Sequence, residues 1–316
     1  MQSGACTRPG TGSRSGSAAT STEPPARSGG ILALDVGGTK LAGGLVDAAG
    51  GVEAREVLPT PITDSADEVL ASLVDVAKAV IARATSPPVA CGVGCGGPMA
   101  GGLVSPLNIP AWRAFPLAGA LADALAIPVA VDNDAKALAL AEGWLGAACG
   151  VRDYLAMVVS TGIGGGVVVD GRLLDGRLGN AGHVGHVNVE PEGRPCVCGS
   201  HGCLEAEAAG PAIEARTGRS ASEAPLAERV RAGTLVGRAV ASVACLLDLD
   251  LVVVGGSVAL GFGTPFFAAA QEELGARARI AFARGCRVVP VGLGELAPLI
   301  GAAVVALRVR DEAHVG

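Results

Sequence analysis

The first strand-like pattern in this chain is ILALDVGGTKLAGGLVD, residues 31–47. Two apolar runs with the composition of buried strands flank a turn of glycine, threonine and lysine. Because so short a turn reverses the chain, the stretch predicts a β-hairpin and not a strand that leads into a crossover helix. In the turn, Gly37 and Gly38 let an anion approach the backbone, and Thr39 can donate to phosphate oxygens. Asp35 offers the carboxylate oxygen that Mg²⁺ prefers, usually through water.

The hairpin pattern returns at residues 154–169, YLAMVVSTGIGGGVVV. Between and after the two hairpins, apolar strands alternate with helical periods such as SADEVLASLVDVAKAVIARAT at 65–85, which is typical of the α/β class. Two such hairpins, each at the start of a series of strands and helices, indicate a duplicated architecture of two similar lobes. Two turns in equivalent places could clamp the phosphate tail of a nucleotide, although each turn taken alone fits an ordinary hairpin equally well.

The composition describes a globular protein and excludes some classes of partner. With 316 residues, half of them apolar, the chain is long enough for one large or two ordinary domains. Its net charge is −6 and no run of Lys or Arg occurs, so the footprint of a nucleic-acid-binding protein is absent. No apolar run reaches membrane-spanning length. Residues 1–29 are rich in Ser, Thr, Gly and Pro and lack the apolar core of a signal peptide. We therefore expect a disordered tail on a cytoplasmic protein.

Two polar residues follow the apolar strand in VDNDAKALALAEG, 131–143. Asn133 and Asp134 lie where that strand gives way to a helix, and the carboxyl ends of strands face the ligand crevice in α/β proteins. Asp134 there could accept a proton from a substrate hydroxyl, and Asn133 could orient that hydroxyl or its neighbour. A helix N-cap explains either residue equally well.

A nearby glycine motif, GVGCGG at 92–97, matches the G-x-G-x-x-G pattern of dinucleotide-binding folds. Pro98 and a glycine-rich loop follow it, where a dinucleotide-binding fold needs a helix. We therefore expect no dinucleotide site at these residues.

Histidine and cysteine crowd together in GHVGHVNVEPEGRPCVCGSHGCLE, 182–205. The spacing H-x9-C-x-C-x4-C selects four ligands: His186, Cys196, Cys198 and Cys203. Three thiolates and one imidazole complete a tetrahedral zinc shell, which is the structural type of site. A zinc hydrolase needs an open coordination position, and four ligands leave none. The alternative is a chance grouping of reduced cysteines.

Five motifs together resemble the sugar kinases of the ROK family, which takes its name from repressors, open reading frames and kinases. They are DVGGTK, NDA, STGIGGG, GHVGH with CVCGSHGCLE, and VVVGGS, in that order between about residues 30 and 310. The resemblance implies an actin-like ATPase (ribonuclease H-like) fold with two similar lobes around a nucleotide and sugar cleft. It divides the chain into an N-terminal lobe at 30–133 and a C-terminal lobe at 134–294 with a zinc-binding loop at 183–205. A final helix at 295–316 would pack back on the N-terminal lobe.

The same resemblance assigns roles to individual residues. Asp134 would be the base that takes the proton from the sugar's 6-hydroxyl. Sugar binding would fall to Asn108, Asn133, His183, His186 and Glu205. The phosphates of ATP and Mg²⁺ would be held by Asp35, Gly37, Gly38, Thr39, Lys40, Thr161, Gly162, Gly164 and Gly165, and the adenosine by Gly255 and Gly256. The resemblance also implies a structural zinc and a homodimer or homotetramer, with polyphosphate as an alternative donor.

One position departs from the family pattern. Most kinases of the family have glutamate three positions before the zinc histidine, whereas this chain has His183. That histidine resembles bacterial N-acylmannosamine kinases more than typical glucokinases, and an imidazole can donate as well as accept a hydrogen bond. Glucose and N-acetylmannosamine are therefore the leading substrates. Lys136 matches no family role, and we expect it to face solvent.

The same family also contains sugar-responsive transcriptional repressors, which carry a DNA-binding module ahead of the kinase-like body. Only about 29 low-complexity residues precede DVGGTK here, too few for that module. We therefore expect an enzyme and not a repressor.

Overall fold

The computed structural model describes residues 29–315, so the tail expected at 1–29 lies, apart from Gly29, outside the described residues. Within this range the chain forms two compact units. Unit 1 comprises 142–174 and 182–294, and unit 2 comprises 29–141, 175–181 and 295–315. The boundary falls inside a continuous helix, C-terminal to the boundary expected after Asn133.

Unit 2 is built on a five-stranded mixed sheet with the order β3-β2-β1-β4-β7. Its strands are β1 Ile31–Val36, β2 Lys40–Val46, β3 Val52–Pro59, β4 Ala90–Cys95 and β7 Val129–Asn133, with a small ribbon of β5 Met99–Ala100 and β6 Leu103–Val104. Its helices are α1 Ala66–Arg83, α2 Leu117–Leu125 and α9 Ala297–Val315, together with most of α3 Asp134–Trp144. The first three strands pair antiparallel, whereas β1–β4 and β4–β7 pair parallel.

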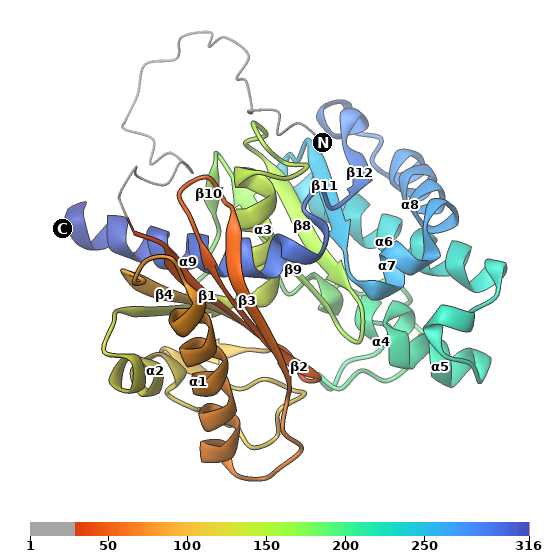
Figure 1. Ribbon diagram of the computed structural model, residues 1–316. Helices are drawn as coiled ribbons and strands as arrows, with labels where there is room; N and C mark the ends of the chain where they lie inside the picture. The colour runs from red at the N-terminus through yellow and green to blue at the C-terminus, as the bar shows by residue number, and fades with distance from the viewer. Residues whose placement is uncertain (1–28, 316) are drawn as a thin grey trace, which may run out of the picture. The chain divides into compact units, whose positions relative to one another are not determined.

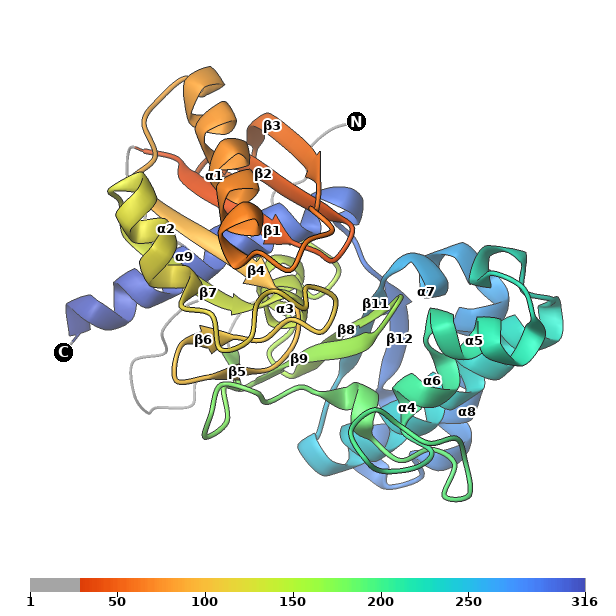
Figure 2. The ribbon, with the colours of Figure 1, turned by 90° about the horizontal axis from the view of Figure 1, so that it is seen from below.

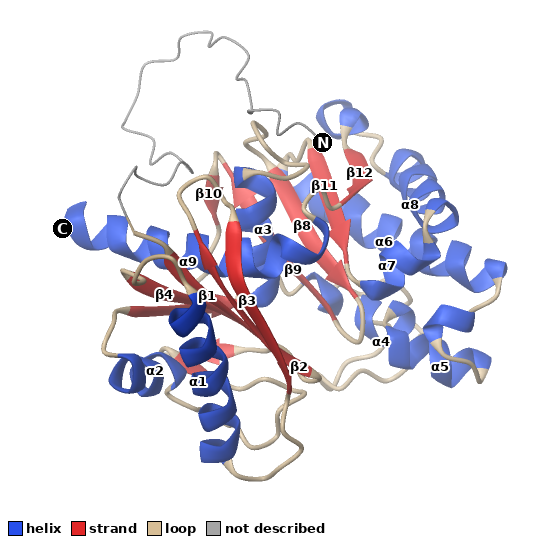
Figure 3. Ribbon diagram, viewed as in Figure 1, coloured by secondary structure: helices blue, strands red, loops and turns tan. Residues whose placement is uncertain are grey.

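Unit 1 repeats this plan with the sheet order β10-β9-β8-β11-β12 (Figure 3). Its strands are β8 Tyr154–Val159, β9 Ile163–Val169, β10 Arg172–Leu173, β11 Leu251–Gly255 and β12 Arg287–Pro290. Its helices are α4 Leu204–Ala208, α5 Gly210–Thr217, α6 Leu226–Leu247, α7 Ser257–Phe262 and α8 Thr264–Arg277, with 3-10 turns at Val184–His186, Ala221–Glu223 and Ala281–Gly285. A further 3-10 turn, Gly294–Leu296, spans the boundary with unit 2. Again an antiparallel hairpin opens the sheet and two parallel strands extend it. The predicted duplication within the α/β class is confirmed.

In unit 2, helices cover both faces of the sheet, and the side chains along each strand point alternately to one face and the other. Leu32, Leu34 and Val36 point to one face, where they share a core with α1 and α2. Gly92 of β4 points to the other face, and a Cβ there would lie 1.8 Å from the Ala302 carbonyl oxygen of α9. Figures 1 and 2 show α1 and α2 on one side of the strands and α9 on the other. Close helix packing therefore accounts for Gly92, the first glycine of GVGCGG.

One helix in the described range, α6, has the length and the mean hydropathy, 1.5, that a membrane span would need. It lies in the core of unit 1, where its Leu235, Val236 and Val240 are buried with Phe266 and Leu274 of α8. Burial of this kind is what the central helix of a globular core shows, and it explains the apolar composition of α6.

Candidate active site

The turn of the first hairpin is held closed by hydrogen bonds. The Gly37 N–H donates to the Lys40 carbonyl oxygen at 3.0 Å, and the Thr60 hydroxyl donates to the Gly37 carbonyl oxygen at 2.7 Å. Asn108 lies directly against this turn, because a Cβ on Gly38 would be 2.4 Å from the Asn108 Cβ. Gly38 is thus required for the close approach of a residue expected to bind sugar, a contact that no sequence pattern indicated. Thr39 and Lys40 at the tip are exposed.

The turn of the second hairpin occupies the equivalent place between β8 and β9, with Val159 paired to Ile163. Glu205 of α4 reaches this turn: its Oε2 accepts a hydrogen bond from the Ile163 N–H at 2.8 Å. The same oxygen would lie 3.0 Å from a Cβ on Gly162. Glu205, the expected sugar-binding glutamate, therefore contacts the glycine turn that was expected to hold phosphates. That turn lies about 40 residues before Glu205 in the chain.

The other expected nucleotide residues of unit 1 lie in or beside this hairpin. Thr161 is exposed in the turn, and Gly164 pairs with Val158 inside β9. Gly165 also lies in the strand, where a Cβ would come within 3.0 Å of the Val184 side chain. Its lack of a side chain therefore admits the 3-10 turn Val184–His186 onto the strand.

The turn after β11 approaches the same point. Gly255 ends the strand, and Gly256 has φ 95°, with a Cβ that would lie 2.3 Å from the Val159 carbonyl oxygen. The hydroxyls of Ser160 and Ser257 are 2.9 Å apart and link this turn to the second hairpin turn. The two serines lie in the motifs STGIGGG and VVVGGS but were not predicted as site residues, because those motifs were interpreted through their glycines and threonine.

Two carboxylates lie close together in unit 2, at the carboxyl ends of β1 and β7. A Cβ on Gly94, which lies between them, would be 3.8 Å from Asp35 Oδ1 and 3.7 Å from the Asp134 Cα. Burial and the nearby Asp134 carboxylate raise the pKa of Asp35 to about 7, and Lys40 opposes that rise. A cation beside the two acids would relieve both the burial cost and the repulsion. The pair therefore has the chemistry of a site for a divalent cation and for proton transfer.

Asn133 serves as a cap for α3, as the alternative interpretation required. Its Oδ1 accepts hydrogen bonds from the N–H groups of Ala135 at 3.0 Å and Lys136 at 3.4 Å. Its amide nitrogen donates to the Gly97 carbonyl oxygen at 3.3 Å. The cap fixes the first turn of α3, in which Asp134 Oδ1 accepts from the Ala135 N–H at 2.8 Å.

Lys136 does not face solvent, so the expectation for it was wrong. It is 2% exposed, and its Nζ lies 2.8 Å from Asp132 Oδ1 and 2.7 Å from Asp175 Oδ1. Arg308 of α9 also pairs with Asp175, at 3.2 Å between Nη1 and Oδ1. Together the two cations hold the pKa of Asp175 below its ordinary value, although its partial burial acts in the opposite direction. Burial of Lys136 is tolerated because its charge is paired on both sides.

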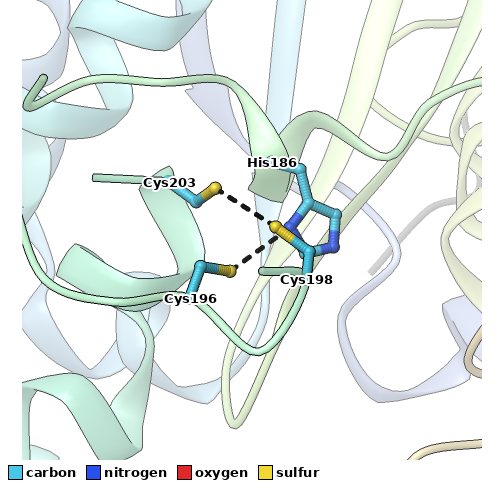
Figure 4. A group of neighbouring side chains, drawn as sticks. All are labelled: His186, Cys196, Cys198 and Cys203. Carbon is cyan, nitrogen blue, oxygen red and sulfur yellow. Dashed lines mark hydrogen bonds between the residues drawn. The ribbon is translucent and has the colours of Figure 1, made fainter. Parts of the chain in front are cut away.

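The expected zinc ligands converge. The ligand atoms of His186, Cys196, Cys198 and Cys203 all lie within 4.8 Å of one another, and Figure 4 shows the four side chains pointing toward a common centre. Cys196 Sγ is 3.6 Å from His186 Nδ1, and Cys198 Sγ is 3.7 Å from Cys203 Sγ. A tetrahedral zinc with its usual bond lengths separates sulfur from nitrogen by about 3.6 Å and sulfur from sulfur by about 3.8 Å. The cluster therefore fits zinc with all four positions filled by protein.

Glycines permit the loop that presents these ligands. A Cβ on Gly185 would lie 2.1 Å from the Ile163 carbonyl oxygen, so the turn carrying His186 packs directly on β9. Gly202 has φ 64°, and a Cβ there would lie 1.5 Å from the Glu190 carbonyl oxygen. His183 lies at the start of this turn, with its ring centroid 6.3 Å from that of His186.

We expect the purified protein to carry about one zinc ion per chain, because the closed set of ligands binds tightly without a substrate. Cys198→Ser should lose most of this zinc, and inductively coupled plasma mass spectrometry measures both proteins. The matched control is Cys245→Ser, since Cys245 lies on α6 outside the cluster. Equal zinc content in the Cys198→Ser and wild-type proteins would contradict the assignment.

This chain is similar to known proteins of one family. The sequence profile of the ROK family matches residues 31–309. The N-acetylmannosamine kinase of Citrobacter koseri is 38% identical over an alignment of 248 residues, which covers 73% of this chain and 84% of that enzyme. The chain belongs to the ROK family.

Solved ROK structures have the same fold. The ROK hexokinase of Thermus thermophilus superposes with a TM-score of 0.77 and 36% identity, covering 89% of this chain and 99% of that one. A ROK glucokinase of Streptomyces griseus, solved with glucose and AMPPNP, gives a TM-score of 0.74 at 29% identity over 89% and 100% of the two chains. The predicted family and the actin-like ATPase fold are confirmed.

Proposed function

We propose that this chain, a sugar kinase of the ROK family, transfers the γ-phosphoryl group of ATP to the 6-hydroxyl of a hexose or N-acetylhexosamine, with N-acetylmannosamine as the preferred sugar. The observation that carries the chemistry is the pair Asp35 and Asp134 at the carboxyl ends of β1 and β7. The choice of sugar rests on His183 and on the 38% identity with an N-acetylmannosamine kinase.

In the proposed reaction, Asp134 accepts the proton of the 6-hydroxyl while that oxygen attacks the γ-phosphorus. The bond from the γ-phosphorus to the bridging oxygen breaks, and ADP leaves. Asp134 is suited to this role because the capped first turn of α3 fixes its backbone. Phosphoryl transfer depends mainly on positioning and on charge neutralisation, so a fixed base and fixed phosphates are what the protein must supply.

Nucleotide binding is proposed for the two hairpin turns and the turn after β11. Asp35, Gly37, Gly38, Thr39 and Lys40 in unit 2, and Thr161, Gly162, Gly164 and Gly165 in unit 1, would hold the phosphates. Gly255 and Gly256 would lie beside the adenosine. Asp35 would hold Mg²⁺, which neutralises phosphate charge when bound. Burial and the nearby Asp134 carboxylate raise the pKa of Asp35, and a cation beside the pair would lower it.

Sugar binding is proposed for Asn108, Asn133, His183, His186 and Glu205. The Asn133 amide keeps a second N–H for a hydroxyl, and Glu205 keeps Oε1, because Oε2 is the oxygen bonded to Ile163. Zinc would brace the loop that joins His183 to Glu205 and would take no part in the transfer, since its four ligands leave no open position. We place the enzyme in the cytoplasm as a homodimer or homotetramer.

The proposed sugar preference is tested by ADP release with glucose, mannose, N-acetylglucosamine and N-acetylmannosamine. We expect the highest kcat/KM for N-acetylmannosamine. His183→Glu should move the ratio of kcat/KM values toward glucose by at least roughly 10-fold, because a changed hydrogen-bonding group discriminates at least as strongly as one methylene in a hydrophobic pocket. His201→Glu is the matched control, because His201 is an exposed histidine of the same loop and is not a zinc ligand. A large preference of the wild-type enzyme for glucose would refute the role given to His183.

A further inference from the structure

Glu207 is a buried carboxylate, the fifth residue of CLEAEA at 203–208, and lies two residues after the expected sugar-binding glutamate. It is 2% exposed and lies on α4, the short helix that begins directly after the zinc ligand Cys203. Nothing in the proposed transfer uses it. Burying a carboxylate costs desolvation free energy, which opposite charges and hydrogen bonds must compensate. The partners of Glu207 therefore indicate what it does.

One oxygen of Glu207 binds the backbone at the start of residues 194–203, which we call the cysteine segment. Its Oε1 accepts a hydrogen bond from the Arg194 backbone N–H at 2.7 Å. Gly193 makes this approach possible, because a Cβ there would lie 2.6 Å from the same oxygen. Cys196 lies two residues after Arg194. Since Glu207 is itself on the helix that follows Cys203, its carboxylate joins the two ends of the segment that supplies all three thiolates.

The other oxygen anchors this join to the core of unit 1. Glu207 Oε2 lies 2.7 Å from Arg231 Nη2 on α6 and 3.5 Å from Arg216 Nη1 on α5. Burial alone would raise the pKa of Glu207, but the Arg194 N–H and the two guanidinium groups hold it below its ordinary value. Glu228 on α6 is 6% exposed and pairs with Arg216 at 2.5 Å, so the two arginines face two carboxylates.

The cysteine segment itself has little regular structure to hold it. Between Arg194 and Cys203 its backbone makes local hydrogen bonds, such as Gly202 N–H to the Arg194 carbonyl oxygen at 2.8 Å and Cys196 N–H to the Ser200 carbonyl oxygen at 2.8 Å. These bonds shape the turn. The Gly202 carbonyl oxygen also accepts from the N–H groups of Val189 at 2.8 Å and Glu190 at 3.2 Å, which attaches the Cys203 end of the segment to the residues that follow His186. The Arg194 end is the one that Glu207 attaches. The Arg194 side chain adds an attachment through the Ala212 carbonyl oxygen at 2.9 Å, at the same end as the bond to Glu207.

We propose that Glu207 is a positioning residue for the zinc site: its carboxylate fixes Cys196 and Cys198 relative to Cys203 before the metal binds. This inference rests on the zinc assignment within the proposed function. Residues that orient metal ligands without touching the metal typically change its affinity by roughly 10–100-fold, and we expect an effect in that range.

The test measures the dissociation constant of zinc by competition with a chromophoric chelator. Glu207→Ala should weaken zinc binding by roughly 10–100-fold. Glu207→Gln should weaken it less, because the amide oxygen can still accept from the Arg194 N–H although the pairing with Arg231 is lost. Glu192→Gln is the matched control, since Glu192 is an exposed acid on the same loop, and its zinc affinity should equal that of the wild type.

Several outcomes would overturn the proposal. Zinc affinity within twofold of the wild type in Glu207→Gln and Glu207→Ala would do so, as would an equal loss in Glu192→Gln. Should Glu207→Ala fail to fold, judged by circular dichroism, the zinc affinity of Glu207→Gln decides: a loss of more than twofold supports the proposal, and a smaller change overturns it. A wild-type protein that binds no zinc would instead refute the zinc assignment, so the two failures are distinguishable.

Discussion

Asp134→Asn should lower kcat by roughly 10²–10⁴-fold, the contribution that a positioned general base makes to proton transfer. The amide cannot take the proton of the 6-hydroxyl, but its oxygen can still accept from the Ala135 N–H, so the first turn of α3 should be preserved. Sugar affinity should therefore change little. Steady-state ADP release gives kcat, and isothermal titration calorimetry with N-acetylmannosamine gives the dissociation constant of the sugar.

The control for this variant is Asp123→Asn, which makes the same chemical change on the exposed face of α2 in the same unit. Its kcat should equal that of the wild type. If Asp134→Asn keeps kcat within threefold of the wild type, Asp134 is not the base. If kcat and sugar affinity fall together, Asp134 acts mainly in binding.

Lys136→Met should reduce the free energy of unfolding by about 2–3 kcal/mol. Removing one partner of a buried ion pair typically costs about 3–5 kcal/mol, because the charge that remains is desolvated without compensation. Here the cost is smaller, since Arg308 still pairs with Asp175 and the Asp175 side chain is 45% exposed. Urea denaturation followed by tryptophan fluorescence measures the change, and buried Trp112 reports on unit 2.

Lys78→Met on α1 is the control, because Lys78 is an exposed lysine of the same unit. It should change the free energy of unfolding by no more than about 0.5 kcal/mol, as is usual for surface positions. A wild-type stability in Lys136→Met would show that the buried ion pairs contribute nothing net. Combining Lys136→Met with Asp132→Asn should recover part of the loss, because the Asp132 carboxylate, left with only the 3.9 Å pairing to Arg308, is then removed.

Much of the fold could be predicted because its signals are local. A glycine turn between two apolar runs specifies a hairpin, and the repetition of that pattern specified the duplication that the two sheets show. The convergence of His186, Cys196, Cys198 and Cys203 could also be predicted, since the four residues lie within one loop and match the ligand types of a structural zinc site.

The partners of single charged residues could not be predicted in this way. Asp132 lies only four residues before Lys136, and that spacing alone is equally common on an exposed helix face. The partner Asp175 comes 39 residues after Lys136, and Arg308 comes another 133 residues after Asp175. Glu207 and Glu205 are both acids in CLEAEA, and the pattern does not say which one is buried among arginines. A helical period indicates a face of the helix but not what covers that face.

The elements, the repeated hairpin turns and the cluster of His186, Cys196, Cys198 and Cys203 follow from the sequence, because short-range sterics and the spacing of possible ligands act within a few residues. Only the tertiary structure decided that Asn108 lies on Gly38, that Glu205 bonds to the second hairpin turn, and that Asp35 lies near Asp134. Those contacts join distant parts of the chain, and they depend on which strands pair and on how closely helices approach them. The chemistry proposed for this kinase depends on both levels: local patterns provide the functional groups, and long-range packing brings them together.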